Sequence, residues 1–261
     1  MKKMPVLFVG HGNPMNALDK NSPFNQNFRQ TTQTFEKPKA ILMISAHWYS
    51  SRLQVTSGEN PPMIYDFHGF PEELSQVQYP AKGSPELAEK VRSLLAPESV
   101  EMNPTRGFDH GAWTVLKYLY PDADVPVVQL SINRLQPAEW HFALAKKLAP
   151  LRDEGVLIIG SGNIVHNLRA ISWEHINQIG AGYDWAFAFR NEINQAIDAQ
   201  NDDLLVHYGQ LGENAELAVP TPDHYLPLLY VMALREPSDK VAFFNDELMA
   251  GSLSMTSVLI G

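Results

Sequence analysis

Short runs of apolar residues recur along the chain and predict β-strands that are buried on both faces. Continuous apolar runs of this length are typical of the central strands of a parallel sheet, because helices cover both sides of such a sheet. Four runs are clear, and a fifth, weaker run lies near the C-terminus. They cover residues 5–9 (PVLFV), 40–46 (AILMISA), 125–131 (VPVVQLS), 155–160 (GVLIIG) and 254–260.

Between these runs, apolar residues recur at helical spacing. The clearest predicted helix covers residues 84–95, where Ser84 is the expected N-cap and Pro85 takes the first helical position. Helices are also expected over residues 137–151, 183–199 and 222–234, the last with Thr221 as its N-cap. Alternating strands and helices predict an α/β fold, a single domain over residues 1–261 with a central, largely parallel or mixed sheet and helices on both faces.

Composition narrows the class of protein further. With 44% hydrophobic and 19% charged residues, the 261-residue chain can bury a large core. The net charge of −9 argues against nucleic acid as a partner, and no stretch approaches the ~20 apolar residues of a membrane span. We therefore expect a cytoplasmic protein without membrane association, present as a monomer or small homo-oligomer. The chain has no cysteine, so any metal must be held by His, Asp or Glu.

Histidines follow the predicted strands at their carboxyl ends, where ligands collect in open α/β sheets. His11 follows the first apolar run, His47 follows the second, and His166 follows the fourth after a short turn. His224 lies in the first turn of the last predicted helix, and His110 lies in a predicted loop. Neutral imidazoles bind Fe(II), Zn(II), Cu and Ni, and three ligands on one face leave positions open for substrate. The pattern predicts a mononuclear catalytic metal site at the C-terminal ends of the strands.

These residues also allow other interpretations. A single strand-end histidine is more often a hydrogen-bonded core residue than a ligand, and His68 is a weaker candidate than the five above. His141, His175 and His207 lie in helical or polar contexts that favour structural or surface roles. The segment GSGN at 160–163 lacks the lysine and the glycine spacing of a P-loop, and Ser161 is not in the G-x-S-x-G elbow of serine hydrolases.

Five motifs then occur in order along the chain: GHGNP at 10–14, SAHW at 45–48, GFDHGAW at 107–113, GSGNIVHN at 160–167 and TPDHYLPLL at 221–229. With a GSLSM segment at 251–255, they resemble the motifs of the class III (LigB-type) extradiol ring-cleaving dioxygenases, and within these the DOPA 4,5-dioxygenase subgroup. The resemblance covers essentially the whole chain. It implies a non-haem metal-dependent enzyme that inserts O₂ into a catechol ring, with a DOPA-like substrate and 4,5-cleavage.

The resemblance also implies roles for the histidines. His11 and His47 match metal ligands, and His224 falls where relatives supply the third ligand. His166 matches the acid/base histidine and is also a possible fourth ligand, while His110 matches a catalytic histidine near the substrate. One divalent metal per chain is expected. Fe(II) is expected for turnover, and the histidine-rich donor set makes Zn(II) an expected occupant of the isolated protein.

The broader class uses two His and one Glu, whereas this sequence offers His224 at the third position, and Asp223 is expected to point elsewhere. We also predict Tyr225 as a substrate contact and residues 61–70 (PPMIYDFHGF) as part of the pocket wall. Two alternatives stay open. One is a zinc-dependent hydrolase or amidase on the same cluster, with Asp109 or Asp223 as the base. The other is a non-catalytic metal-binding relative, which the complete set of histidines argues against.

Overall fold

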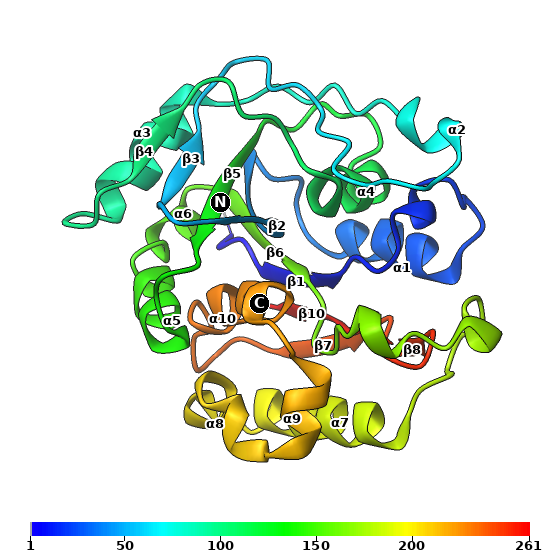
Figure 1. The fold of residues 1–261 in the computed structure, drawn as a ribbon. Helices are drawn as coiled ribbons and strands as arrows, with labels where there is room; N and C mark the ends of the chain where they lie inside the picture. Colours follow the sequence, from blue (N-terminus) through cyan, green and yellow to red (C-terminus); the bar gives the residue numbers. More distant parts are fainter. Residues whose placement is uncertain (1) are drawn as a thin grey trace.

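An eight-stranded mixed sheet forms the centre of the protein, whose computed structural model describes residues 2–261 (Figure 1). The strand order is β4-β3-β5-β2-β6-β1-β10-β7. The four strands β5, β2, β6 and β1 run parallel, while β10 pairs antiparallel with β1 and with β7. The predicted α/β fold with a largely parallel, mixed sheet is confirmed. The strands are β1 (Val6–Gly10), β2 (Ala40–Ser50), β3 (Gln54–Thr56), β4 (Glu101–Asn103), β5 (Val127–Asn133), β6 (Val156–Gly162), β7 (Val241–Phe244) and β10 (Ser257–Ile260), and β8 (Leu248–Met249) pairs separately with β9 (Leu253–Ser254).

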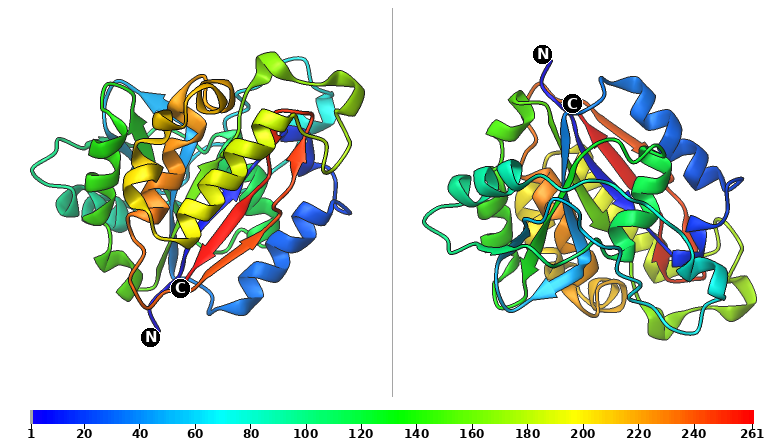
Figure 2. Two further views of the ribbon diagram at one scale, coloured as in Figure 1. Left: turned by 90° about the horizontal axis from the view of Figure 1, so that it is seen from below. Right: turned by 90° about the horizontal axis from the view of Figure 1, so that it is seen from above.

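Helices cover both faces of the sheet because successive side chains of a strand point to opposite sides. In β2, Leu42 and Ile44 pack into one core, and Ile41 and Met43 pack into the other. Figure 2 shows α1 and α7 on opposite sides of the sheet. Helices α1 (Pro23–Thr31), α2 (Glu72–Ser75) and α4 (His110–Leu119) contribute to the second core, and α3 (Pro85–Leu94), α5 (Ala138–Lys146), α6 (Pro150–Asp153), α7 (Asp184–Asp198), α8 (Asp202–Val206), α9 (Glu213–Ala218) and α10 (Leu226–Met232) contribute to the first.

Two predicted helices are divided at prolines. The helix expected over residues 222–234 consists of a short 3-10 helix, η6 (Pro222–His224), followed by α10, which has Pro227 in its first turn. The helix expected over residues 137–151 ends at Lys146, and α6 begins at Pro150. A proline has no N–H to donate and its ring clashes with the preceding turn, so each proline starts a new helix instead of continuing the old one.

Several elements escaped prediction from the sequence. The strands β3 and β4 have three residues each, which is too short for a periodic pattern, and α1 and α4 carry glycine, threonine or asparagine at positions that weaken the helical signal. The last central strand, β10, begins at Ser257 and not at residue 254. Within the described residues, no helix is both long enough and apolar enough to cross a membrane.

Candidate metal and substrate site

Five histidines converge at the carboxyl ends of the parallel strands; we call His11, His47, His110, His166 and His224 the histidine cluster. His11 follows β1 directly, and His47 lies within β2. At His47 the pairing of β2 with β5 shifts register between Ile44 and Tyr49, an irregularity of the kind that re-aims side chains beside active sites. His166 follows β6 through a turn, and His224 ends η6.

His110 reaches the cluster from a helix and not from the predicted loop. It is the first residue of α4, and Asp109 caps this helix by accepting a hydrogen bond from the backbone N–H of Ala112 at 3.2 Å. The predicted loop at His110 was wrong. Helix α4 begins at His110 itself, so the apolar residues at helical spacing appear only after this residue in the sequence. Capping by Asp109 fixes the direction in which α4 presents the His110 ring.

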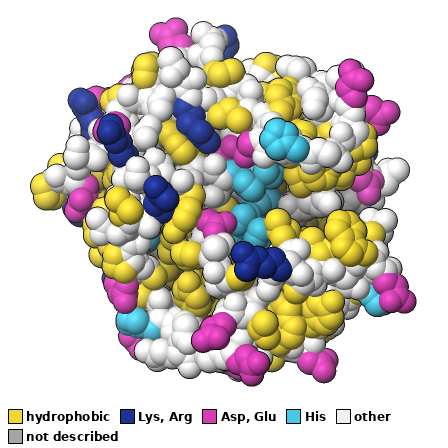
Figure 3. Space-filling model, in the orientation of Figure 1, with side chains coloured by type: hydrophobic (Ala, Val, Ile, Leu, Met, Phe, Trp, Pro, Cys, Tyr) yellow, Lys and Arg dark blue, Asp and Glu magenta, His cyan; other side chains and the backbone are white. Residues whose placement is uncertain are grey.

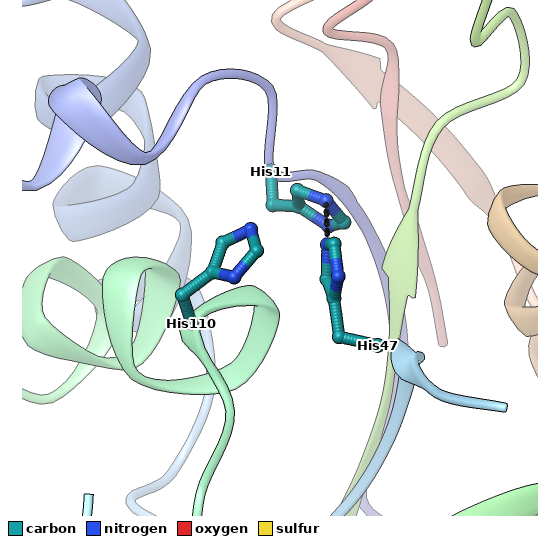
Figure 4. Close-up of side chains that lie close together, drawn as sticks. All are labelled: His11, His47 and His110. Carbon is teal, nitrogen blue, oxygen red and sulfur yellow. Dashed lines mark hydrogen bonds between the residues drawn. The ribbon is translucent and has the colours of Figure 1, made fainter. Parts of the chain in front are cut away.

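The ring nitrogens of three of these histidines face one another (Figure 4). Nε2 of His11 lies 3.1 Å from Nε2 of His47, and one ring nitrogen each from His11, His47 and His110 lie within 4.8 Å of one another. The ring centre of His224 lies 5.2 Å from that of His11 and 5.0 Å from that of His47. Two nitrogens bound to one ion at about 2.1 Å each, at octahedral or tetrahedral angles, lie about 3.0–3.4 Å apart. The separation of His11 and His47 therefore fits a shared metal ion.

Hydrogen bonds fix the tautomer of His11. The hydroxyl of Ser161 donates to the carbonyl oxygen of Gly111 at 2.6 Å, so its oxygen is left to accept from Nδ1–H of His11 at 3.0 Å. With the proton on Nδ1, Nε2 carries the lone pair that a metal requires. This arrangement, in which a second group orients a ligand through its other ring nitrogen, is usual around metal-binding histidines.

Asp223 orients His224 through its Nδ1, as Ser161 orients His11. Its carboxylate contacts Nδ1 of His224 and does not line the cavity, which agrees with the expectation that Asp223 points away from the ligand position. The reason is that η6 is a 3-10 helix whose tight turn lets the side chain of residue 223 fold back on its neighbour. Burial raises the pKa of Asp223, but the hydrogen bond to His224 outweighs burial, and the net pKa is well below the usual range. Asp223 is therefore ionised and favours a proton on Nδ1 of His224.

Asp66 is a polar residue of the site that sequence reasoning did not single out. Its Oδ1 lies 2.9 Å from Nδ1 of His110 and accepts the backbone N–H of His110 at 2.9 Å, while Oδ2 lies 3.6 Å from Nδ1 of His47. Burial alone would raise the pKa of Asp66, but its contacts with His110 outweigh burial and lower the pKa to about 2. The sequence signal that could have identified Asp66 is its position as an acidic residue next to an aromatic residue within the segment 61–70.

His11, His47 and His166 are neutral at pH 7. Burial lowers the pKa of His11 and His47, and the positive charge that neighbouring imidazoles would carry lowers it further. Burial, followed by His224, lowers the pKa of His166 to about 3. Neutral imidazole is the form that binds a metal, so protonation does not compete with metal binding near neutrality.

Glycines next to the cluster allow the backbone elements to approach one another. A Cβ on Gly111 would lie 2.6 Å from Oγ of Ser45 and 2.7 Å from Cδ2 of His47, and a Cβ on Gly162 would overlap the carbonyl oxygen of His224. Gly111 thus lets α4 pack against β2 at His47, and Gly162 lets η6 pack against the end of β6. The glycines of GFDHGAW and GSGNIVHN are explained by this close packing.

The stacked pair of His166 and His224 has a distinct geometry. The two ring centres lie 3.4 Å apart and the ring planes are 4° from parallel. An imidazole binds a metal along the nitrogen lone pair, which lies in the plane of the ring. Two rings stacked in this way do not direct their lone pairs at one ion.

The cluster forms the floor of a cavity of about 670 Å³. In Figure 3 the histidines lie at the base of a hollow with hydrophobic side chains beside it. As predicted, part of the segment 61–70 forms its wall. The lining residues are His11–Pro14, His47, Asp66–Phe70, His110, His166, Leu168, Ile171, Trp173, Ile176, His224 and Leu253.

Two further predicted residues lie outside the cavity. Tyr225 is fully buried, donates its hydroxyl to the carbonyl oxygen of Leu205 at 2.9 Å, and packs against Tyr208. It belongs to the core and is not carried into the proposed site. His141 is a hydrogen-bonded core residue, as expected, because its Nε2 lies 3.1 Å from the carbonyl oxygen of Asn133 and its Nδ1 lies 2.9 Å from the hydroxyl of Tyr230.

Comparison with known proteins agrees with this site. The family model described as the catalytic LigB subunit of aromatic ring-opening dioxygenase matches residues 5–225. The chain is 44% identical over 263 residues to the 4,5-DOPA dioxygenase extradiol of Escherichia coli K12, covering 99% of this chain and 95% of that protein. It is 38% identical to the 4,5-DOPA dioxygenase extradiol of Beta vulgaris, covering 97% and 94%. The crystal structure of an uncharacterized Escherichia coli K12 protein superposes with a TM-score of 0.86 at 41% identity, covering 99% and 100% of the two chains.

The chain therefore belongs to the LigB family of aromatic ring-opening dioxygenases. Within that family it groups with the extradiol ring-cleaving enzymes, and the enzyme class predicted from the five sequence motifs is confirmed. Within the histidine cluster, His11, His47 and His110 lie close enough together to fit the single metal site that such a reaction requires.

Proposed function

We propose that this dioxygenase opens the ring of a DOPA-like catechol by 4,5-cleavage, with His11, His47 and His224 as the metal ligands and His166 as the acid/base residue. The observation that carries the proposal is the convergence of imidazoles at the floor of the cavity, with Nε2 of His11 and Nε2 of His47 only 3.1 Å apart. Two relatives at 44% and 38% identity bear the name 4,5-DOPA dioxygenase extradiol, which supports the choice of substrate.

The donor set supports one divalent metal. His11 and His224 each have Nδ1 engaged, by Ser161 and by Asp223, so both present Nε2 as a ligand. When bound there, Fe(II) supplies open positions for the catechol oxygens and O₂ together with redox chemistry that Zn(II) lacks. We therefore expect Fe(II) to support turnover and a Zn(II)-loaded protein to be inactive.

His166 and His110 supply the proton chemistry. His166 lines the cavity as a neutral ring and can accept a phenolic proton at a ring nitrogen, then return it to the developing product. The stacking of His166 on His224 supports a role for His166 beside the ligand set and not within it. His110 faces the cavity, and its Nδ1 lies 2.9 Å from the carboxylate of Asp66, whose negative charge favours a proton on that nitrogen.

The hydrolase alternative lacks a suitable base. Asp109 is fully buried, caps α4, and accepts hydrogen bonds from Ser45 and Gln129, while Asp223 is engaged with His224. Neither lines the cavity. Asp66 does line it, but its carboxylate is engaged by the backbone N–H of His110 and lies against the His110 ring.

The test is anaerobic reconstitution with Fe(II), followed by addition of L-DOPA or another catechol in air. A yellow ring-opened product is expected, and its structure by mass spectrometry and NMR reports the bond that was cleaved. The same protein loaded with Zn(II) serves as the control. If the iron-loaded protein opens no member of a catechol panel, the proposed function is wrong.

A further inference from the structure

Asp66 faces two histidines that have different proposed roles. Its Oδ1 lies 2.9 Å from Nδ1 of His110, and its Oδ2 lies 3.6 Å from Nδ1 of His47. The ring centres of these two histidines are only 3.8 Å apart (Figure 4). Among the described residues that line the cavity, Asp66 is the one acidic side chain and none is lysine or arginine, so its charge acts on the two imidazoles without a competing cation in the lining.

Packing around α4 holds Asp66 in this position. The backbone N–H of Ile64, two residues before Asp66, donates to the carbonyl oxygen of Phe108 at 2.7 Å. The indole N–H of Trp113 in α4 donates to the carbonyl oxygen of Ile64 at 3.0 Å. Because His110 is the first residue of α4, the chain that carries Asp66 and the helix that carries His110 form one packed unit.

The backbone and the ring of His110 both meet Asp66. The backbone N–H of His110 donates to Oδ1 of Asp66 at 2.9 Å, which is the same oxygen that lies next to Nδ1 of the ring. The next residue along the chain, Phe67, has its ring centre 5.8 Å from that of His110, with the ring planes at 78°. The His110 ring is therefore bounded by a carboxylate and by an aromatic ring, which together limit its orientation.

His47 meets Asp66 through the nitrogen that a metal would leave free. Nε2 of His47 lies 3.1 Å from Nε2 of His11, and its Nδ1 is on the side of Asp66. The distance of 3.6 Å between this Nδ1 and Asp66 is longer than a hydrogen bond, so the carboxylate acts on His47 through its charge. A negative charge next to Nδ1 favours the proton on that nitrogen and leaves the lone pair on Nε2.

We propose that Asp66 is a positioning residue for ring cleavage, which places the imidazole proton on Nδ1 of both His47 and His110. The Nε2 lone pair of each ring is then free, in His47 for the metal and in His110 for the bound catechol. This inference rests on the proposed function for those two roles, while the tautomers themselves do not depend on it. It adds to that function one carboxylate that controls a metal ligand and a catalytic residue together.

NMR of the full-length, metal-free protein tests the tautomers directly, because long-range nitrogen–proton correlations of an imidazole ring show which nitrogen carries the proton. In mildly alkaline buffer, where imidazole is neutral, we expect Nδ1–H in both His47 and His110. In Asp66→Asn the side-chain oxygen can still accept the backbone N–H of His110, but the amide is uncharged and its NH₂ group can donate to a ring nitrogen. The ratio of Nδ1–H to Nε2–H is expected to fall about tenfold in His110 and about threefold in His47, because the contact with His47 is longer.

Metal affinity and turnover supply two further measurements. Competition with a chelator is expected to show about tenfold weaker Zn(II) binding in Asp66→Asn, because His47 loses both the favoured tautomer and a negative charge near the bound cation. With saturating Fe(II), kcat is expected to fall about tenfold, because His110 is no longer held for the catechol.

Two variants with the same chemical change serve as controls. Glu72→Gln removes an exposed acid at the start of α2, a few residues from Asp66, and Glu72 does not line the cavity. It is expected to change no tautomer. Asp223→Asn is expected to change the tautomer of His224, whose Nδ1 it contacts, and to leave the two histidines at Asp66 as they are.

Several results would overturn the inference. They are unchanged tautomers in Asp66→Asn, a change confined to His110, an equal change in Glu72→Gln, or unchanged Zn(II) affinity. Asp66→Ala, which leaves no side-chain oxygen, is measured alongside and must shift both tautomers in the same direction. If the tautomers and the Zn(II) affinity change as expected but the iron-loaded wild-type protein opens no catechol, the proposed function fails and the control of both tautomers by Asp66 stands.

Discussion

Nδ1 of His11 lies 3.0 Å from Oγ of Ser161, and the same hydroxyl lies 2.6 Å from the carbonyl oxygen of Gly111. One serine thus joins β1, β6 and α4 at the site and decides which nitrogen of His11 is protonated. The contact is fully buried, so water cannot replace it without rearrangement.

Replacing this serine tests its effect on the proposed ligand. Ser161→Ala is expected to lower metal affinity by about 10–100-fold, because His11 loses the partner that holds its tautomer and orientation. Ser131→Ala is a matched control: Ser131 is also a buried strand serine with two hydrogen bonds, to Arg52 and Gln54, but it contacts no histidine of the cluster. Competition with a chelator measures the affinity. Equal metal affinity in the two variants would contradict the role of Ser161.

The third ligand is tested by a pair of variants. His224→Ala is expected to lower metal affinity by more than about 100-fold, whereas His110→Ala is expected to retain the metal and lose turnover. His207→Ala, at a partly exposed position away from the cavity, is the control for loss of an imidazole. Metal content after dialysis and kcat are measured for each. The opposite result, with the metal lost from His110→Ala and kept in His224→Ala, would move the third ligand to His110.

The role of His166 predicts a separation of binding from chemistry. His166→Gln is expected to keep the metal and to lower kcat by about 10²–10⁴-fold, because a general acid/base contributes about that much. Glutamine keeps a polar side chain against His224 but cannot take up a proton. Single-turnover kinetics and metal analysis check this. A variant that is isolated without metal would show that His166 is a ligand.

The close approach of α4 to β2 at Gly111 predicts that an added side chain there disturbs the packing at His47. Gly111→Ala places a methyl group 2.7 Å from Cδ2 of His47 and 2.6 Å from Oγ of Ser45, so either α4 or His47 must move. Unfolding free energy is expected to fall by about 1–3 kcal/mol, and metal affinity is expected to fall with it. Gly209→Ala is the control, because nothing lies within 4 Å of its added methyl group. Chemical denaturation with and without metal measures both effects; unchanged values in Gly111→Ala would rule out this packing constraint.

The burial of His141 predicts that the protein loses stability in acid through a residue outside the catalytic site. Burial lowers its pKa from 6.5 to about 4, so the unfolded chain binds a proton that the native protein excludes between these values. Stability contributed by neutral His141 is therefore complete above pH 6.5 and is lost as the pH falls toward 4. The loss amounts to roughly 3 kcal/mol at 1.36 kcal/mol per pKa unit.

Denaturant unfolding of metal-free protein between pH 7 and 4.5 measures this slope. The slope is expected to be smaller in His141→Phe, which retains the aromatic volume and removes the titrating group. At pH 7 the variant is itself destabilised by about 1–3 kcal/mol, because the hydroxyl of Tyr230 loses its partner. An identical pH slope in the two proteins would show that His141 does not titrate in this window.

The sequence by itself determined the fold class, the central strands and the histidines that follow them. Buried parallel strands require continuous apolar runs, and the runs around residues 5–9, 40–46 and 155–160 stand out because Ser45 is the one polar residue within them. The carboxyl ends of parallel strands meet at one edge, so His11 and His47 were expected to lie together before any distance was known.

Tertiary structure decided how the side chains are arranged around these positions. Three contacts depend on elements distant in sequence or on a tight local turn. They are the contact of Ser161 with His11, that of Asp223 with His224, and that of Asp66 with both His47 and His110. Tyr225 shows the same limit, because one step along the chain from His224 turns a side chain from the cavity into the core. Such directions are set by packing between elements, and a linear pattern of apolar and polar residues does not record them.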